Sequence, residues 1–151
     1  MKTLLLYMSV HHGNTEKIAN MMGEQLNASV RKITEVTAAD LEKYDLIGFG
    51  SGIYGMRHHL AILNFVNGLP DSKELKQKAF IFSTSGAGLI HYHRPLRGRL
   101  YAKGFEVVGD FSCKGFDTFG PLKLLGGINK DRPNEADFFR ARTFAESLKS
   151  L

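Results

Sequence analysis

The sequence of 151 residues contains one cysteine, no tryptophan and no long hydrophobic run. A single cysteine, Cys113, excludes an internal disulfide framework and any zinc or iron–sulfur site built only from cysteines. The apolar segment that follows Lys2 is too short for a signal peptide, and no stretch is long enough to span a membrane. We therefore expect a cytoplasmic protein that folds around its own hydrophobic core.

Runs of charge and low-complexity segments are also absent. The chain is basic, with a formal net charge of +5 and a pI of about 9.4, but it has no run of five or more basic residues. A basic balance raises nucleic acid as a partner, yet scattered lysines and arginines support it only weakly, and we expect no nucleic-acid partner. Without repeats or linkers, residues 1–151 are expected to form a single domain.

The most informative stretch is the turn at residues 9–16, which follows the apolar residues 3–8. Helical spacing then begins, with apolar positions at Ile18, Ala19, Met22 and Leu26. A buried strand thus passes through a short turn into a helix, which Thr15 or Asn14 is placed to cap. Such a turn points backbone N–H groups and the positive end of a helix dipole at one spot. It predicts an anion site with added donors from Ser9 and Thr15, the alternative being an ordinary capped turn.

The rest of the chain alternates strand-like and helix-like segments. Further strands are expected at residues 29–33, 45–51, 78–84 and 105–113, and helices at 58–66, 94–103 and from about 133, with a helical turn at 38–43. This alternation requires a parallel sheet with right-handed crossovers. The first, third and fourth strands are apolar throughout and belong inside the sheet, whereas the second and fifth are polar enough to be edges. We predict a doubly wound, five-stranded α/β fold of order 2-1-3-4-5, with its ligand crevice between the first and third strands.

Three short motifs in this order resemble the flavodoxin family. Gly13-Asn14-Thr15-Glu16 is similar to the family's phosphate loop, and the two later loops, Ser51-Gly52-Ile53-Tyr54-Gly55 and Thr84-Ser85-Gly86-Ala87-Gly88, lie where its flavin loops belong. The resemblance covers the whole chain and implies a flavodoxin-like fold with flavin mononucleotide (FMN) as cofactor. It implies that the phosphate is held by Ser9, His11, Asn14 and Thr15. It also implies that the two later loops flank the isoalloxazine ring, largely through backbone groups.

The chain departs from typical flavodoxins in three ways. Val10, His11 and His12 stand where the family has hydroxyl residues, and the basic charge contrasts with the usual acidic one. The lack of tryptophan leaves Tyr54, Tyr92 or a histidine to stack on the ring. The predicted cofactor site comprises Ser9, Val10, His11, His12, Gly13, Asn14, Thr15, Ser51, Gly52, Ile53, Tyr54, Gly55, Thr84, Ser85, Gly86, Ala87 and Gly88.

Two other motifs have competing interpretations. Residues 50–55 match the dinucleotide pattern GxGxxG, but they follow the wrong strand, and the next strand ends in Ser83-Thr84 rather than in an acid. The six histidines lie in the three loops at one end of the sheet, where His91 and His93 have a spacing suited to a metal. Because Glu16 is the only carboxylate in these loops, we expect no metal site. Imidazoles that raise the positive potential around an anion fit the pattern better.

A connection of 19 residues, 114–132, carries six large apolar side chains: Phe116, Phe119, Leu122, Leu124, Leu125 and Ile128. Connections this long are usually functional or disordered, and the apolar content argues against disorder. The segment is either a cover over the end of the sheet or a lid or docking surface, and contact with a membrane through it is a further alternative. Cys113 is expected to be a buried residue at the strand end.

These observations favour an electron carrier that binds FMN and serves a redox partner protein. The predicted basic rim comprises Arg57, Arg94, Arg97 and Arg99, so the partner is expected to be acidic where it docks. One alternative is a flavin-dependent oxidoreductase that acts on a quinone or tetrapyrrole-like substrate, and another is a non-redox phosphate-binding module. The carrier is preferred because these loops offer neither a nicotinamide site nor a carboxylate pair for acid–base work.

Overall fold

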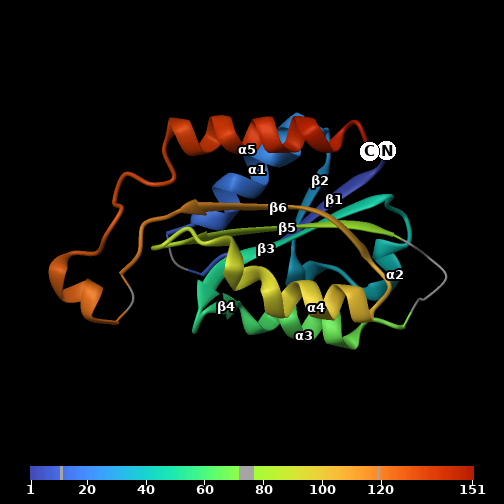
Figure 1. The fold of residues 1–151 in the computed structure, drawn as a ribbon, viewed down its shortest axis with the longest axis horizontal. Helices are drawn as coiled ribbons and strands as arrows, with labels where there is room; N and C mark the ends of the chain where they lie inside the picture. Colours follow the sequence, from blue (N-terminus) through green and yellow to red (C-terminus); the bar gives the residue numbers. More distant parts are fainter. Residues whose placement is uncertain (11, 72–76, 119) are drawn as a thin grey trace.

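The computed structural model describes residues 1–10, 12–71, 77–118 and 120–151, which form a twisted sheet between two layers of helices (Figure 1). The strands are β1 (Thr3–Met8), β2 (Ser29–Lys32), β3 (Leu46–Tyr54), β4 (Arg57–His58), β5 (Lys78–Ser85) and β6 (Glu106–Lys114). The helices are α1 (Asn14–Leu26), α2 (Ala38–Leu41), α3 (Leu60–Gly68), α4 (Arg94–Ala102) and α5 (Glu135–Leu148). Short 3₁₀ turns are η1 (Ile33–Glu35), η2 (Ile90–His93) and η3 (Gly120–Leu125).

The main sheet is parallel, with the order β2-β1-β3-β5-β6. When the five parallel strands are numbered along the chain without β4, this is the predicted order 2-1-3-4-5. The strands at the two edges, β2 and β6, are also the predicted ones, so both predictions are confirmed. The sequence pattern did not predict β4, a two-residue strand that pairs antiparallel with the end of β3, with Ile53 opposite His58 and Tyr54 opposite Arg57. A pair this short has no period-2 pattern from which it could be read.

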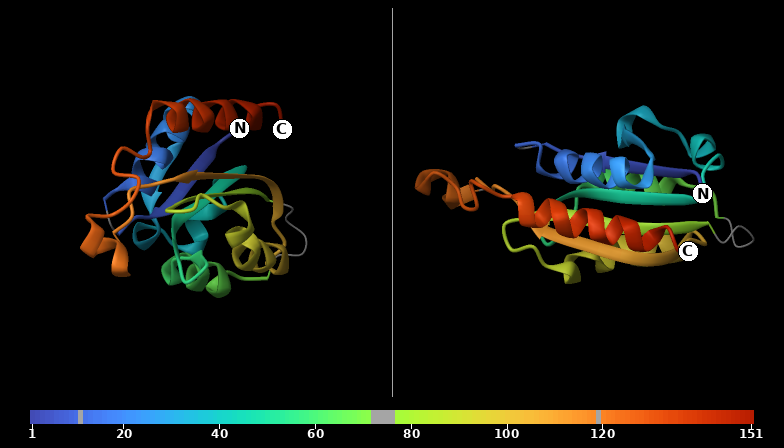
Figure 2. Two further views of the ribbon diagram at one scale, coloured as in Figure 1. Left: turned by 60° about the vertical axis from the view of Figure 1, so that its left-hand side comes forward. Right: turned by 90° about the horizontal axis from the view of Figure 1, so that it is seen from above.

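Helices cover both faces of the sheet (Figures 1 and 2). Helices α1 and α5 lie on one face, and α3 and α4 lie on the other. Successive side chains of β1 alternate between the two cores: Leu4 and Leu6 pack toward α3 and α4, whereas Leu5 and Tyr7 pack toward α1 and α5. A strand buried on both faces in this way needs an apolar residue at every position.

Two local expectations were wrong. Helix α1 is capped by neither Thr15 nor Asn14, because Gly13 occupies the N-cap position and no side chain caps the helix. Helix α3 begins at Leu60 rather than at His58, since His58 belongs to β4 and the ring of His59 caps the helix.

No helix among the described residues is long and apolar enough to cross a membrane.

Candidate functional site

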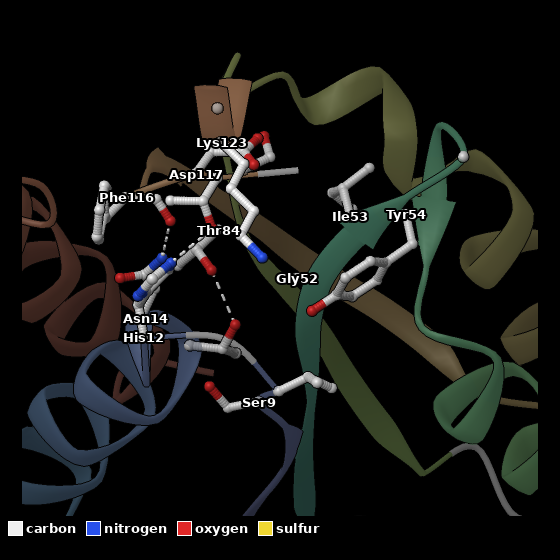
Figure 3. A pocket seen from close by; sticks show the side chains of 16 residues that line it. Ser9, His12, Asn14, Gly52, Ile53, Tyr54, Thr84, Phe116, Asp117 and Lys123 are labelled. Atoms are coloured by element: carbon white, nitrogen blue, oxygen red, sulfur yellow. Dashed lines mark hydrogen bonds between the residues drawn. The ribbon is translucent and has the colours of Figure 1, made fainter. Parts of the chain in front are cut away.

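A pocket of about 330 Å³ opens at the carboxyl ends of β1, β3 and β5 (Figure 3). Most of the predicted site residues line it: Ser9, Val10, His12, Asn14, Thr15, Gly52, Ile53, Tyr54, Gly55, Thr84, Ser85 and Gly86. The remaining lining residues are Phe116, Asp117, Thr118 and Lys123, which the sequence analysis did not predict. The tertiary fold therefore brings three separate loops together at the topological switch point of a parallel sheet, the usual place for a ligand in such folds.

The other predicted residues that the structure describes do not line the pocket. Gly13 is the N-cap residue of α1, with a left-handed φ of 64° that glycine adopts without strain, and it allows the chain to turn from β1 into α1. Ser51 is buried in β3, where its hydroxyl accepts a hydrogen bond from His59 N at 2.9 Å. Ala87 and Gly88 continue the turn beyond Gly86. His11 falls outside the described residues.

One side of the pocket is formed by the N-terminus of α1. The first amide groups of a helix have no partners within the helix, and here they lie beside the hydroxyls of Ser9 and Thr15. Thr15 Oγ1 lies 2.8 Å from Thr84 Oγ1, which ties this loop to the end of β5. Asn14 Nδ2 donates to Phe116 O at 2.8 Å, while Asn14 Oδ1 is buried with no hydrogen-bond partner among the described residues. Instead of capping α1, the side chains of Asn14 and Thr15 thus connect separate loops around the pocket.

The opposite side is formed by the hairpin at residues 52–58. Tyr54 is partly buried there and meets His59 edge-on, with 5.3 Å between the ring centroids. Burial raises the pKa of Tyr54, and the nearby carboxylate of Asp117 raises it further. A Cβ at Gly52 would lie 2.9 Å from Tyr54 Oη, so a larger residue at this position would displace the end of the Tyr54 side chain. Of the stacking candidates Tyr54 and Tyr92, only Tyr54 lines the pocket.

Residues 116–132, which we call the outer segment, supply the wall that the sequence analysis missed. Asp117 and Ile128 form an antiparallel bridge, and Asn129 Nδ2 donates to Gly86 O at 3.0 Å. The ring of His12 packs on Phe116 at 4.0 Å. Beyond the wall, the segment extends past the end of the sheet (Figures 1 and 2). The length and apolar content of the segment indicated a cover or lid, but nothing in the sequence indicated which residues face a pocket.

Leu124 and Leu125 stand at the tip of this segment and are 90% and 78% exposed. Lys123, next to them, turns its amine into the pocket (Figure 3). The predicted basic rim contributes less than expected, because Arg97 is paired with Asp110 and Arg99 donates to Pro95 O. None of the four rim arginines lines the pocket.

The histidines divide into two groups, and the expectation that all of them add positive potential was wrong. His58 and His93 are buried together, with 4.9 Å between their ring centroids. Burial lowers the pKa of His58 to about 3, helped by repulsion from His93, so this ring is neutral at pH 7. Burial also lowers the pKa of His93 to about 4, aided by the charge of Arg97. Asp110 does not reverse this effect, since its carboxylate is shared with Arg97.

Two further residue types bear on the chemistry. Cys113 is buried at the end of β6, as predicted, and burial raises the pKa of its thiol to about 12, which removes the thiolate at neutral pH. Among the described residues, no group of three histidine, cysteine or acidic side chains is arranged to hold a metal ion.

Comparison with known proteins identifies the family. Residues 4–90 match the family model of the flavodoxin domain. An uncharacterized protein of Methanocaldococcus jannaschii is 48% identical over 150 residues, which cover 98% of each chain. A solved flavodoxin from the domain Archaea matches 99% of this chain and 97% of its own, with 17% identity and a TM-score of 0.73.

Other solved structures share the fold at similarly low identity. Oxidised flavodoxin 2 from Bacillus cereus covers 99% of each chain, with 19% identity and a TM-score of 0.72. The rubredoxin oxygen:oxidoreductase of Desulfovibrio gigas matches 99% of this chain but only 36% of its own, with 17% identity and a TM-score of 0.68. Since the family model spans more than half of the chain, the protein belongs to the flavodoxin family, which implies a flavin cofactor.

Proposed function

We propose that this protein binds FMN in the pocket at the end of the sheet and carries electrons to a partner protein. The observation that carries the proposal is the convergence of the α1 N-terminus and two glycine-containing loops on one cavity of about 330 Å³. A helix N-terminus is suited to a phosphate, and a cavity of this size is within the range of small-molecule sites.

The residues on the phosphate side fit the charged end of FMN. The amide groups at the start of α1 and the hydroxyls of Ser9 and Thr15 can donate hydrogen bonds, and phosphate oxygens can accept them. The buried Oδ1 of Asn14 requires a donor, and the hydroxyl groups of the ribityl chain are of that kind. Lys123 adds an ammonium group to the pocket, and His12 places an imidazole where typical flavodoxins have a hydroxyl residue.

The hairpin side fits a flat ring. Gly52 and Gly86 line the cavity without a side chain, where a Cβ would lie 2.9 Å from Tyr54 Oη and 2.7 Å from Asp117 Oδ2 respectively, and Tyr54 offers an aromatic surface beside them. Bound FMN would supply the redox chemistry, and the protein would orient the ring and control its exposure to water and partners.

Titration of the purified apoprotein with FMN and with riboflavin tests this proposal. We expect FMN to bind at least tenfold more tightly, because riboflavin lacks the phosphate that the α1 terminus would hold. Equal affinities would mean that the phosphate side is assigned wrongly, and absence of binding to either ligand would contradict the function itself.

The second candidate is a flavin-dependent oxidoreductase. It is favoured by Asp117 and Lys123, which bring an acid and an amine into the pocket that the sequence analysis did not foresee. Stepwise anaerobic reduction followed by absorbance separates the two candidates. Reduction in two resolved one-electron steps supports the carrier, whereas a single two-electron step with turnover of a quinone supports the oxidoreductase.

We further infer that the partner protein docks beside the outer segment and that its docking surface is acidic. We place this encounter in the cytoplasm. Lys123 and the exposed Leu124 and Leu125 combine a positive charge with apolar surface next to the pocket. Rates of electron transfer to an acidic ferredoxin should then fall as salt is raised. A rate that is indifferent to salt would contradict an acidic docking face.

A further inference from the structure

A buried polar cluster lies directly behind the hairpin that lines the pocket. His58, the last residue of β4, closes this hairpin and is only 1% exposed. Its Nε2 lies 3.1 Å from Phe82 O on the neighbouring strand β5. Phe82 is followed closely by Thr84 and Ser85, which also line the pocket. His58 therefore connects the two loops proposed to flank the flavin ring.

His93 extends the same cluster to β6. Its Nε2 lies 2.7 Å from Ser83 Oγ, and its Nδ1 lies 2.7 Å from Asp110 Oδ1. Ser83 Oγ in turn lies 3.2 Å from Ser112 Oγ. These contacts join η2, β5 and β6 immediately behind the pocket.

The hydrogen-bond partners determine where the protons lie. A carbonyl oxygen only accepts, so Nε2 of His58 carries the proton and Nδ1 does not. Nδ1 of His58 is buried and has no hydrogen-bond partner among the described residues. A second proton on this ring would therefore be buried without an acceptor, on a ring whose centroid lies 4.9 Å from that of His93. The closed hairpin accommodates His58 only as a neutral imidazole.

The charges packed around the pair do not alter this conclusion. Besides the two serines, the polar groups that face it are Asp110 from β6 and Arg97 from α4, and these two are paired with each other. The contact of His58 with β5 is to a neutral carbonyl oxygen. No carboxylate among the described residues is therefore placed to stabilise a charged His58.

The cluster is not a hydrolytic site. Ser83, His93 and Asp110 are connected in the order of nucleophile, base and orienting acid. However, Ser83 and His93 are 0% and 1% exposed, so no substrate reaches the hydroxyl. The cluster can act only through the loops that it holds.

We propose that His58 is a positioning residue that holds the hairpin at residues 52–58 against β5, and that opening of the hairpin is coupled to the uptake of one proton by His58. Its consequence for the cofactor rests on the proposed function, since the hairpin is the wall proposed for the flavin ring. Opening returns His58 to water, where an ordinary imidazole titrates near pH 6.5. Burial holds the pKa of the closed form near 3, so acid favours the open form throughout the interval between these values.

Amide hydrogen exchange measured by NMR, without and with FMN, tests the proposal. In the wild-type protein, the opening constant of the Ile53 and Tyr54 amides should rise about tenfold for each pH unit below 6, which is the signature of one proton. In His58→Gln the side-chain amide can still donate to Phe82 O but does not titrate, so the slope should vanish. In His58→Phe the donor is lost, and opening at pH 7 should be roughly tenfold more frequent. The amides of β1 serve as the control for global unfolding.

Ligand affinity provides an independent readout. His58→Phe should weaken FMN and riboflavin by the same factor, because the hairpin faces the ring and not the phosphate, and His58→Gln should restore both. Equal slopes in the wild type and His58→Gln would overturn the proposal, and this comparison holds even where His58→Phe does not fold. Failure of the wild type to bind any flavin would contradict the proposed function, while the exchange slopes would still decide the role of His58.

Discussion

The hairpin at residues 52–58 and the outer segment at residues 116–132 form facing parts of the same pocket, but different contacts hold them. The hairpin is anchored by buried side chains: His58 Nε2 lies within hydrogen-bond distance of Phe82 O, and Ser51 Oγ accepts a hydrogen bond from His59 N. The outer segment is anchored by a backbone bridge and by Asn129, and its tip lies in solvent.

This difference in anchoring indicates that the hairpin and the outer segment have different roles. Buried polar groups are costly unless every partner is in place, so they select a single geometry, which suits the binding of a rigid ring. An exposed apolar tip adds no stability to the isolated chain, because its side chains stay in water. It becomes buried only when another surface covers it. Cofactor affinity should therefore depend on the hairpin, and partner recognition on the outer segment.

Acid should have the largest effect, and it acts on the hairpin side. His58 and His93 have pKa values near 3 and 4 when folded, against an ordinary 6.5, so the unfolded chain binds more protons as the pH falls below 6.5. The free energy of unfolding should fall by about 1.4 kcal/mol per pH unit for each imidazole. Urea unfolding at pH 7, 6 and 5 measures this slope, and His58→Gln should lose about half of it. Constant stability over this range would contradict two buried neutral imidazoles.

The α1 terminus, which lies between the two walls, should show the next largest effect. Thr15→Ala removes a donor proposed for the phosphate, and FMN affinity should fall ten- to hundredfold, about 1.5–3 kcal/mol. Riboflavin affinity should change little. Thr143→Ala on the exposed side of α5 is the matched control, with no expected change in either titration. Equal losses for FMN and riboflavin would place Thr15 on the ring side.

Gly86 tests the point where the outer segment meets the loop after β5. A Cβ there would lie 2.7 Å from Asp117 Oδ2, so Gly86→Ala must displace that carboxylate. Flavin affinity should fall several-fold, about 1 kcal/mol, in a fluorescence titration. Gly68→Ala is the control, since a Cβ at Gly68 has nothing within 4 Å. Equal affinities of the two variants would mean that this contact does not shape the pocket.

The tip of the outer segment should show the smallest effect. Replacing both Leu124 and Leu125 by serine should change the free energy of unfolding by less than about 0.5 kcal/mol, because both side chains are already in water. Leu63→Ala, in the core, should cost about 2–5 kcal/mol in the same urea experiment. A core-sized loss from the double variant would show that the tip packs within the chain. Electron transfer to a partner should be slowed all the same.

Much of the fold could be predicted because it depends on apolar and polar patterns within single strands and helices. The apolar run of β1 and the polar character of β2 and β6 were enough to predict the strand order. The loops that line the pocket could also be located, since the carboxyl ends of parallel strands converge. Which of these residues bind a cofactor stays a prediction.

Local sequence patterns predict which segments become strands, which strands lie inside the sheet and at which end the loops gather, because hydrophobic periodicity and turn residues act over a few positions. Three features follow from the folded chain alone: Asn14 contacts Phe116, the outer segment lines the pocket, and His58 is neutral. These outcomes depend on contacts between residues far apart in the chain and on the loss of water around them, neither of which leaves a periodic pattern in the sequence.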